Sequence, residues 1–591
     1  MNQIIASSDE STDLGAQHEQ NLAAKGTRKT LGAYYTPSWL VEGVLDLAFS
    51  AMLNDAAGRG VEAVGSLRVL DPACGSGRFL VAVKARITGA LVALGQDREV
   101  AEQIARRCLF GFDVDPMAIE LAGRELAGHE LDGHELAGRD LGCTQGLRVL
   151  DALNASPESE PLLEPGSFDL VVGNPPFLNQ LSKRSARDRT ATAALRERFG
   201  AAIGPYTDPA AAFMLLGAQL AQRNGGVVAM VEPMSLIASR DAGGVRRALS
   251  EAGALEHLWL VGGGAFDASV EVCVPVVRMG AEHQRTQVTC GHSPAEFKGT
   301  FDPSEQAVTQ AGGHAGAGGG SGSGGVNDGA FGGGVKGAGG SNGAREASWS
   351  EALALSLGVP RVELGTDGEL GDIAVATADF RDQYYGLGPH VVDLETPPSG
   401  GDASWPKLIT SGLIDPAHLL WGTRPTRFNK RTFSYLRVNR SQLPEPLQRW
   451  AETRLVPKVM VATQTKIPEA VVDSEGEMLP SVPVISAVPN HPADLWKVAA
   501  VLTCPTVAAL GARRHLGSAL SSKAFRMRAT DVMALPLPTD LAEWNKAAAL
   551  LQAQAPLVEV GEAMNRAYGL GSNQTLCDEL TAWWLGQMPT R

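Results

Sequence analysis

The chain has 591 residues, of which 44% are hydrophobic and 20% charged, so it can bury several cores and is expected to form about two to four globular domains. Its net charge of −14 argues against a protein that coats nucleic acid through overall charge, although a local basic surface can exist within that average. Seven scattered cysteines without a CxxC pair exclude a structural zinc cluster and a disulfide framework and suit a reducing compartment.

The N-terminal segment is polar, and residues 1–30 are expected to form a disordered arm. This arm contains no apolar signal-type stretch, and no run of about 18 apolar residues occurs elsewhere in the chain. We therefore expect a cytoplasmic protein that does not contact a membrane.

Residues 31–300 alternate short apolar runs with segments rich in Ala, Leu, Glu and Arg. This alternation predicts an α/β domain built on a doubly wound, Rossmann-like and mostly parallel sheet. The predicted strands are the runs LRVLDPA, CLFGFDVD, LRVLDAL, FDLVVGNPP, GGVVAMVEP, ALEHLWLVG and VCVPVVRM.

Two low-complexity segments interrupt the pattern. From Glu120 to Gly142 a five-residue repeat of the form ELAGx is expected to lie at the surface. It contains HELDGH, which resembles a zinc motif, but His129 and His134 are five residues apart and two ligands on one helix face need a spacing of four, so we predict no metal site. The window Ala311–Ala344 holds about a quarter of the 68 glycines, and we predict a flexible linker or insert over 301–350.

The first predicted strand leads into a turn of small residues. Glycines there let the backbone approach a ligand at the carboxyl end of a strand, which is the usual ligand position in an open α/β sheet. No Gly-Lys-Ser/Thr follows, and the third glycine of the dinucleotide fingerprint is missing, so a phosphate loop and a dinucleotide site are disfavoured. The candidate cofactor-binding residues of this turn are Asp71, Ala73, Cys74, Gly75 and Gly77.

Acidic residues end the next two predicted strands. Asp113 could accept hydrogen bonds from both hydroxyls of a ribose, and Asp151 could accept one from the amine of an adenine ring. Each acid alone could instead cap the following helix. Three acids at consecutive strand ends favour a cofactor that contains a nucleoside.

The fourth predicted strand, Phe168 to Val172, ends in a segment with a distinctive chemistry. Two consecutive prolines after Gly173 fix a rigid loop. The asparagine side chain and the next backbone carbonyl can both accept hydrogen bonds from one NH2 group, while the aromatic ring stacks on a flat base. The alternative is a plain Pro-Pro turn. The candidate catalytic residues are Asn174, Pro175, Pro176 and Phe177.

The segments DPACGSG, FDVD, the LD pair at 150–151 and NPPF, in this order and spacing, resemble the motifs of amino-group DNA methyltransferases that use S-adenosyl-L-methionine. GAYYTPSWLVEGVLDLAF, from Gly32 to Phe49, resembles the motif that closes over the methionine end of the cofactor. That order is the gamma arrangement of N6-adenine enzymes, and the chain is most similar to the Eco57I and TaqI type of type II methylases. The resemblance covers residues 30–280.

The resemblance implies specific roles around the cofactor. Thr36 would lie near the methionine group, and Asp71 with 73–77 would wrap the cofactor. Asp113 would hold the ribose, Val114 would contact the adenine face, and Asp151 would bind the adenine amine.

For the target, the resemblance implies that Asn174 and the carbonyl of Pro175 hold N6 of an adenine flipped out of the duplex. Phe177 would stack on this base, and Phe266, just before a late strand, would cover its other side. An ordinary core phenylalanine is the alternative for Phe266. The methyl group would move in one in-line displacement without a covalent or metal-bound intermediate.

The second half of the chain is expected to bind the duplex. Residues 401–540 carry 17 basic and 11 acidic residues, whereas the rest of the chain carries 34 and 54. We predict an α+β target-recognition domain over 351–540, followed by a helical segment over 541–591. Two basic runs, 421–440 and 510–538, supply the candidate DNA-binding residues Arg424, Arg427, Lys430, Arg431, Lys523, Arg526 and Arg528.

The expected partner is double-stranded DNA, together with a separate restriction nuclease or defence-system proteins, because the activity suits a restriction-modification or phage-defence system. Two alternatives remain open. A methyltransferase of the same fold could act on RNA adenine or protein glutamine, since both present an NH2 group to an Asn-Pro-Pro loop. A non-catalytic DNA-specificity subunit is the other alternative.

Overall fold

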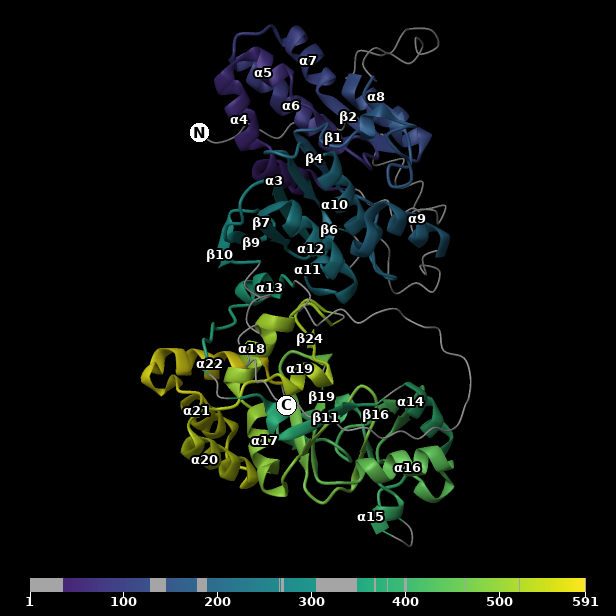
Figure 1. Ribbon diagram of the computed structural model, residues 1–591, viewed down its shortest axis with the longest axis vertical. Helices are drawn as coiled ribbons and strands as arrows, with labels where there is room; N and C mark the ends of the chain where they lie inside the picture. The colour runs from purple at the N-terminus through teal and green to yellow at the C-terminus, as the bar shows by residue number, and fades with distance from the viewer. Residues whose placement is uncertain are drawn as a thin grey trace, which may run out of the picture.

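The computed structural model describes residues 36–127, 145–177, 189–264, 266, 270–303, 348–365, 368–379, 381–397, 401–462, 464–519 and 521–589. The expected N-terminal arm, most of the five-residue repeat and the glycine-rich window lie outside these residues. Two halves are stacked along the long axis, with the N-terminal half at the top of Figure 1 and the C-terminal half below it.

A ten-stranded sheet organises the N-terminal half, with the strand order β10-β9-β7-β8-β5-β4-β1-β2-β3 and β6 paired with β8. The first five strands run parallel, and β8 runs antiparallel to both β5 and β7. This arrangement confirms the predicted α/β sheet, and all seven predicted apolar runs form strands. The bounds are β1 (Val69–Asp71), β2 (Leu109–Asp113), β3 (Leu147–Val149), β4 (Leu170–Gly173), β5 (Val227–Met230), β6 (Glu232–Pro233), β7 (Gly253–Val261), β8 (Val272–Met279), β9 (Thr286–Gly291) and β10 (Glu296–Phe301).

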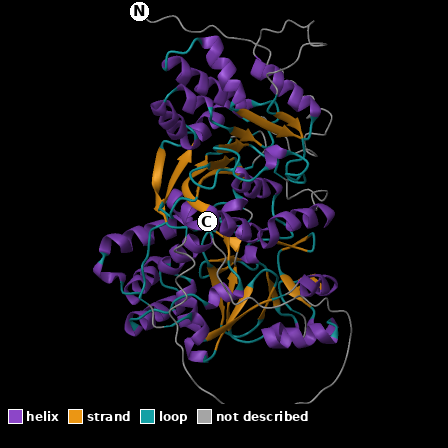
Figure 2. Ribbon diagram, turned by 45° about the horizontal axis from the view of Figure 1, so that its top comes forward, coloured by secondary structure: helices purple, strands orange, loops and turns teal. Residues whose placement is uncertain are grey.

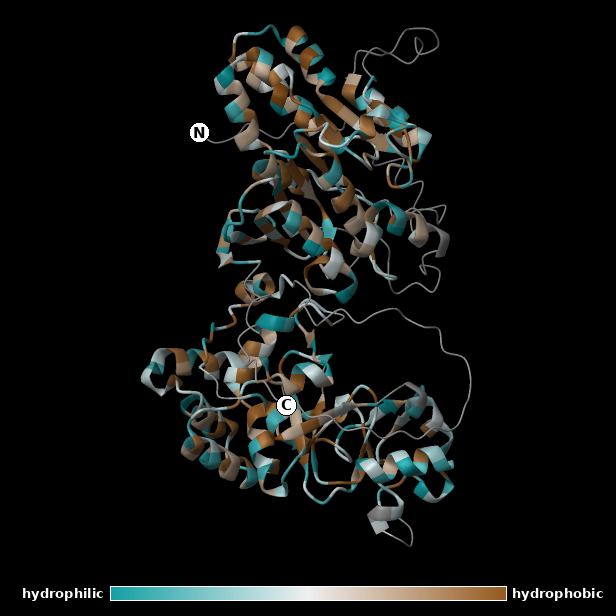
Figure 3. Ribbon diagram, in the orientation of Figure 1, coloured by the Kyte–Doolittle hydropathy of each residue, from teal (hydrophilic) through white to brown (hydrophobic). Residues whose placement is uncertain are grey.

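Helices cover both faces of the sheet (Figure 2), and alternate strand residues divide between two cores. On one face Val69, Leu170 and Val227 pack with helices α3 and α6, and on the other Leu70 and Val228 pack with α10 and α12. The helices are α3 (Ser38–Ala48), α4 (Ser50–Arg59), α5 (Val61–Gly65), α6 (Arg78–Ala93), α7 (Arg98–Arg107), α8 (Pro116–Ala127), α9 (Arg189–Phe199), α10 (Pro209–Leu220), α11 (Ser235–Ala238) and α12 (Gly243–Ala252). Figure 3 shows the resulting hydrophobic strands inside and hydrophilic outer helix surfaces.

The C-terminal half is α+β. Two four-stranded sheets have the orders β11-β23-β19-β21 and β12-β18-β13-β22, and three two-stranded ladders complete it. The strands are β11 (Ala374–Ala378), β12 (Val391–Asp393), β13 (Lys407–Ile409), β14 (Ile414–Asp415), β15 (His418–Leu419), β16 (Thr426–Phe428), β17 (Arg431–Phe433), β18 (Leu436–Val438), β19 (Lys458–Ala462), β20 (Gln464–Thr465), β21 (Glu469–Asp473), β22 (Met478–Pro480), β23 (Ile485–Pro489) and β24 (Phe525–Arg526).

The helices of this half flank its sheets and close the chain. They are α13 (Ser350–Ser356), α14 (Arg381–Leu387), α15 (Gly401–Ser404), α16 (Glu445–Arg454), α17 (Leu495–Leu502), α18 (Pro505–His515), α19 (Ala529–Met533), α20 (Leu541–Gln552), α21 (Leu557–Ala567) and α22 (Gln574–Gln587). Helices α20 to α22 lie between residues 541 and 587. Within the described part of the chain, no single helix is long and apolar enough to cross a membrane, and one bent pair, 492–502 with 505–515, passes that test only when joined.

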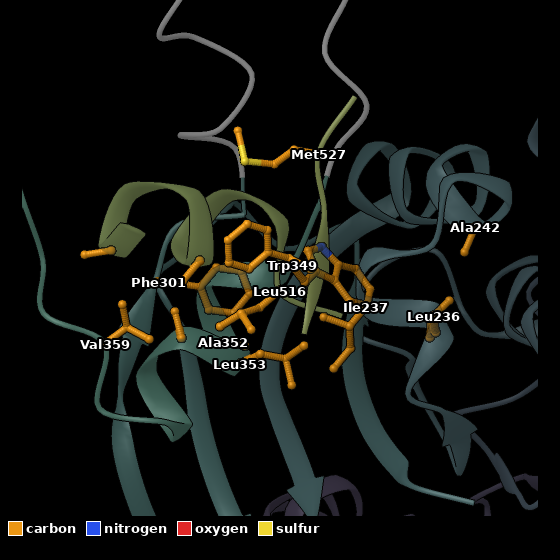
Figure 4. Packing of buried hydrophobic residues seen from close by; sticks show 14 of the residues in the cluster. Leu236, Ile237, Ala242, Phe301, Trp349, Ala352, Leu353, Val359, Leu516 and Met527 are labelled. Carbon is orange, nitrogen blue, oxygen red and sulfur yellow. The ribbon is translucent and has the colours of Figure 1, made fainter. Parts of the chain in front are cut away.

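The two halves meet in one continuous hydrophobic cluster (Figure 4). The indole of Trp349 is fully buried there, and its backbone N–H donates to the carbonyl of Ile237 at 2.9 Å. On the other side the hydroxyl of Ser350 donates to the carbonyl of Leu516 at 2.7 Å. The residues at the start of α13 therefore join α11 of the first half to the end of α18 in the second.

Candidate active site

Asp71 ends β1 in the middle of the sheet, and its side chain is only 2% exposed. Its Oδ1 accepts a hydrogen bond from the backbone N–H of Ala73 at 3.1 Å. A Cβ placed on Gly173, at the end of β4, would lie 2.5 Å from the same oxygen. Only glycine fits at position 173, because any side chain would displace the carboxyl group of Asp71.

Burial changes the charge state of this carboxyl group. It raises the pKa of Asp71 from 3.8 to about 8, and the nearby carboxylate of Asp113 adds to the rise, whereas the Ala73 amide opposes it. Asp71 is therefore largely uncharged at neutral pH in the free protein.

The turn after β1 is held against the end of β2. The backbone N–H of Gly75 donates to Oδ2 of Asp113 at 2.9 Å, and the N–H of Asp115 donates to Oδ1 at 2.9 Å. Gly75 has a φ of +53° and open space where a Cβ would stand. Gly77 has a φ of +87°, and a Cβ placed on it would lie 3.0 Å from the Cβ of Ala122 on α8. The turn is thus fixed by Asp113 and leaves its backbone open over Gly75.

Exposed apolar side chains surround Asp113. Val114 is 57% exposed, Met117 47% and Val149 54%, and Val149 pairs with Asp113 across β2 and β3. Burial raises the pKa of Asp113, and amide donors from Asp115 and Gly75 oppose that rise. A hydrogen-bonding carboxyl group beside exposed apolar surface suits a nucleoside, whose sugar is polar and whose base is flat.

Two of the predicted cofactor residues are engaged differently from the others. The thiol of Cys74 is buried and lies 3.0 Å from where a Cβ of Gly111 would stand, so this residue faces the sheet and offers only its backbone to a ligand. Asp151 is exposed, and its Oδ2 accepts from Nδ2 of Asn154 at 2.7 Å. In the structure Asp151 thus holds a local turn, and no helix that it could cap begins there.

Asn174 connects the end of β4 to Thr36, which lies two residues before α3. Its Nδ2 donates to the hydroxyl oxygen of Thr36 at 3.0 Å, and Thr36 is 7% exposed. Oδ1 of Asn174 is buried and has no hydrogen-bond partner among the described residues. A buried amide oxygen in this state can accept a hydrogen bond from a donor that the described residues do not supply.

The rings of Phe177 and Phe266 lie together beside this loop, 5% and 9% exposed. Their centroids are 6.0 Å apart and their planes make an angle of 68°, so they touch edge to face. Two rings that stack on both sides of one base must be parallel and about 7 Å apart. The predicted pair is therefore brought together, but in the structure it contacts itself.

One buried residue near this loop was missed by the sequence analysis. Glu232 on β6 is 0% exposed. It lies two residues after Met230, the last residue of β5 that pairs with β4. A single acid in the otherwise apolar run GGVVAMVEP was the signal that could have found it. Among the described residues, no group of three or more His, Cys, Asp or Glu side chains is placed to hold a metal ion.

In the C-terminal half, a hairpin carries the first basic cluster. Strands β16 and β17 pair from Thr426–Phe433 to Phe428–Arg431, and the turn residues Asn429 and Lys430 have φ values of +44° and +64°. Phe428 and Phe433 are buried and anchor the hairpin in a core, while Arg427, Lys430 and Arg431 are exposed. The hydroxyl of Tyr384 on α14 accepts from the N–H of Asn429 at 2.8 Å and braces the tip.

The remaining candidate DNA-binding residues are also exposed, with differing partners. Arg424 lies 3.4 Å from the buried carboxyl group of Asp415, and Arg528 binds Asp531 through Nε and Nη2, each at 3.0 Å. Arg526 lies on β24, and Lys523 lies two residues before this strand.

Other members of the two basic runs are structural. Arg437 is 3% exposed, and its guanidinium donates to the carbonyls of Leu394 and Trp405. Arg513 forms an ion pair with Glu351 at 3.1 Å and donates to the carbonyl of Val359 at 3.0 Å. These two arginines stabilise the fold and present no charge to a ligand.

Comparison with known proteins places this geometry in a family. The sequence profile described as N-6 DNA Methylase matches residues 11–306, half of the chain. The chain belongs to the N-6 DNA methylase family. This result confirms the resemblance found in the motifs of the first half.

Two relatives illustrate the extent of the similarity. Over 222 residues the chain is 25% identical to the adenine-specific methyltransferase PglX of Streptomyces coelicolor, a match that covers 31% of this chain and 17% of PglX. The chain thus spans less than a fifth of that curated relative. Its fold is similar to that of the type IIL restriction-modification enzyme MmeI, solved in complex with DNA, with a TM-score of 0.58, 13% identity, and coverage of 98% of this chain and 81% of that one.

Proposed function

We propose that this N-6 DNA methylase is a site-specific DNA methyltransferase that transfers a methyl group from S-adenosyl-L-methionine to N6 of an adenine flipped out of double-stranded DNA. The observation that carries the proposal is the amide of Asn174. Its nitrogen donates to the hydroxyl oxygen of Thr36, and its buried oxygen, at the end of β4, has no hydrogen-bond partner among the described residues. An exocyclic NH2 group is such a donor.

The residues around the turn after β1 fit the cofactor. The open backbone over Gly75 is a cradle that a Cβ would fill, and Asp113 with Val114 and Val149 offers a polar and an apolar surface for a nucleoside. When bound, S-adenosyl-L-methionine supplies a methyl group on a positively charged sulfonium. As the family motifs imply, Thr36 would lie near the methionine group, Asp71 with the turn after β1 would wrap the cofactor, and Asp151 would bind the adenine amine.

The Asn-Pro-Pro loop would activate the target amine by holding it. Oδ1 of Asn174 and the carbonyl of Pro175 can each accept one N6 hydrogen, which directs the nitrogen lone pair away from the adenine ring and makes it nucleophilic. Pro175 and Pro176 restrict the backbone, so the two acceptors keep a fixed separation. The positive charge that develops on N6 is stabilised by the same two oxygens.

The two aromatic rings would hold the target base by stacking. Because Phe177 and Phe266 touch each other in the structure, a base can enter only when at least one ring moves. Their mutual contact would shield the apolar pocket until the base arrives, and base stacking would replace it.

We infer that the C-terminal half is the target-recognition domain, over 351–540, with 541–591 as its helical end and 31–300 as the catalytic domain. The β16–β17 hairpin projects Arg427, Lys430 and Arg431, and these residues would contact DNA phosphates. In Figure 1, β16 and α14 lie on the same side of the molecule as α9 of the catalytic half. A duplex on this side could contact both halves.

A role in restriction-modification or phage defence, with a separate nuclease or other defence proteins, is part of the proposal. It is supported by the two similar proteins, an adenine-specific methyltransferase and a restriction-modification enzyme.

The test uses purified full-length protein with S-adenosyl-L-methionine labelled in its methyl group. Mixed-sequence duplex DNA, single-stranded RNA and a glutamine-containing peptide are offered in parallel. Label is expected only in the duplex, and sequencing of modified adenines in DNA from cells that express the protein should give one recognition sequence. If label appears only in the RNA or only in the peptide, the proposal that DNA is the substrate is wrong.

A further inference from the structure

Glu232 is an anomaly in the catalytic half. It is completely buried, and neither carboxyl oxygen has a hydrogen-bond partner among the described residues. Buried polar groups are nearly always hydrogen-bonded, because an unpaired one loses its contact with water without replacement. The mechanism above gives this residue no task.

Strand pairing places Glu232 beside the Asn-Pro-Pro loop. The N–H of Val231 donates to the carbonyl of Gly173 at 3.0 Å. Glu232 directly follows Val231, and Asn174 directly follows Gly173, so the two residues come after the same interstrand hydrogen bond. On its other side Glu232 pairs with Cys273 at the start of β8, the strand that Phe266 precedes.

Helix α10 closes the same region. Residues of α10 contact β6, and Figure 1 shows the two elements next to each other. Asp208 caps this helix by accepting from the N–H of Ala210 at 3.1 Å, and Ala210 belongs to the hydrophobic cluster that contains Phe177 and Phe266. The backbone of Glu232 thus lies between the end of β4 and the start of β8, and its carboxyl group is close to Asp208 at the start of α10.

The groups that face Glu232 keep it protonated. Burial raises the pKa of Glu232 well above its usual value, and the Asp208 carboxylate raises it further. The other titratable neighbour is the buried thiol of Cys273, whose pKa is also raised by burial. A neutral carboxyl group can donate a hydrogen bond as well as accept one.

The described residues of the catalytic loop supply no such donor to the ring. Oδ1 of Asn174 and the carbonyl of Pro175 only accept, and Nδ2 of Asn174 is already held by Thr36. An adenine base presents ring nitrogens that accept hydrogen bonds, next to the amine that donates them. Loop acceptors on the amine and one donor on a ring nitrogen would together fix the base in its plane.

We propose that Glu232 is a positioning residue for the target base, and that its carboxyl group donates a hydrogen bond to a ring nitrogen of the extruded adenine. This inference rests on the proposed function and extends it to a specific atom of the substrate. It also explains why a buried carboxyl group without a partner is kept beside the catalytic loop.

The experiment compares wild-type protein, Glu232→Gln and Glu232→Leu on duplexes that carry adenine, 1-deazaadenine, 3-deazaadenine or 7-deazaadenine at the target position. The wild type is expected to lose about tenfold in kcat/KM on one of the deaza substrates. Glu232→Leu should lose about the same factor on adenine and lose nothing more on that deaza substrate. Glu232→Gln, whose amide can donate, should stay within about threefold of wild type.

Thermal unfolding separates this role from a purely structural one. Glu232→Leu should raise Tm, because it removes an unpaired buried polar group, and yet lower activity. Thr88→Val is the matched control, since the hydroxyl of Thr88 on α6 is also buried and unpaired among the described residues, and it should leave kcat/KM unchanged.

The outcomes are distinguishable. A Glu232→Leu enzyme with wild-type kcat/KM on adenine, or with a wild-type pattern over the three deaza substrates, would overturn the role of Glu232 alone. A wild-type enzyme that methylates no adenine in any duplex would overturn the proposed function and this inference with it.

Discussion

The two halves of the molecule treat charged residues in opposite ways. In the catalytic half the candidate functional carboxyl groups are buried or bonded at strand ends, as with Asp71 and Asp113. In the C-terminal half the candidate functional cations are exposed on a hairpin, whereas Arg437 and Arg513 from the same basic runs are buried and structural. Candidate functional acids of the first half are therefore mostly buried, whereas candidate functional cations of the second half are exposed.

The difference follows from the ligands proposed for each half. A small cofactor and a single extruded base need a few fixed groups from which water is excluded. A duplex presents a regular row of phosphates, which exposed cations can neutralise without being buried. The predictions below test this contrast, in order of decreasing effect.

The largest effect is expected at the catalytic loop. Asn174→Ala removes the buried oxygen that would accept from N6, and kcat should fall by about 100-fold or more. Cofactor binding, measured by calorimetry, should be unchanged. Asn224→Ala, at an exposed turn before the amino end of β5, is the control, and equal loss in both variants would contradict the assignment.

The next effect concerns the hairpin. Replacing Arg427, Lys430 and Arg431 together by Ala should reduce the slope of log affinity against log salt by about 3, because three phosphate contacts are lost. Fluorescence anisotropy with a labelled duplex at several salt concentrations measures this slope. A triple variant of Arg59, Arg98 and Arg107, which are exposed on α4 and α7, should keep it. Equal slopes for both triple variants would exclude the hairpin from the DNA interface.

A buried arginine should behave differently from an exposed one. Arg513→Ala leaves the carboxylate of Glu351 without its partner at the junction of the two halves and should lower the free energy of unfolding by about 3 kcal/mol. Arg526→Ala should change it by less than about 0.5 kcal/mol and should weaken DNA binding instead. Urea denaturation of the two variants checks the stabilities, and the reverse order would contradict the sorting of the basic runs.

Asp71 should make the stability depend on pH. Its pKa is higher in the folded chain, about 8, than the ordinary 3.8, so folding takes up a proton and the group favours the folded state most at low pH. Between pH 6 and pH 8 the wild type should therefore lose about 2 kcal/mol of stability relative to Asp71→Asn. Denaturation curves across this range measure the difference, with Asp55→Asn on α4 as a control for an exposed carboxyl group. Parallel pH profiles for wild type and Asp71→Asn would show that Asp71 is ionised in the fold.

Much of the catalytic half could be predicted because its signals are local. Each parallel strand is a short apolar run, and several candidate site residues, such as Asp71, Asp113 and Asn174, end such a run or follow it directly. Strands β9 and β10 were not predicted, because they lie at the edge of the sheet and their partly exposed, polar residues do not form an apolar run.

In the C-terminal half the sequence located the basic runs but could not sort them. Arg431 and Arg437 are six residues apart in one run, yet the first is exposed on β17 and the second is held by carbonyls from the 394–405 segment. Contacts with residues distant in the sequence decide such a difference, and no local pattern records them.

By itself, the sequence determined the α/β fold, the family and the order of the motifs, because strand periodicity and turn chemistry depend on neighbouring residues. Tertiary structure alone decided that the Asn174 oxygen is unpaired while Thr36 holds its nitrogen, that Phe177 and Phe266 close on each other, and that Glu232 lies beside the loop. These facts depend on distances between strands and helices far apart in the chain, which are fixed only when the sheet assembles.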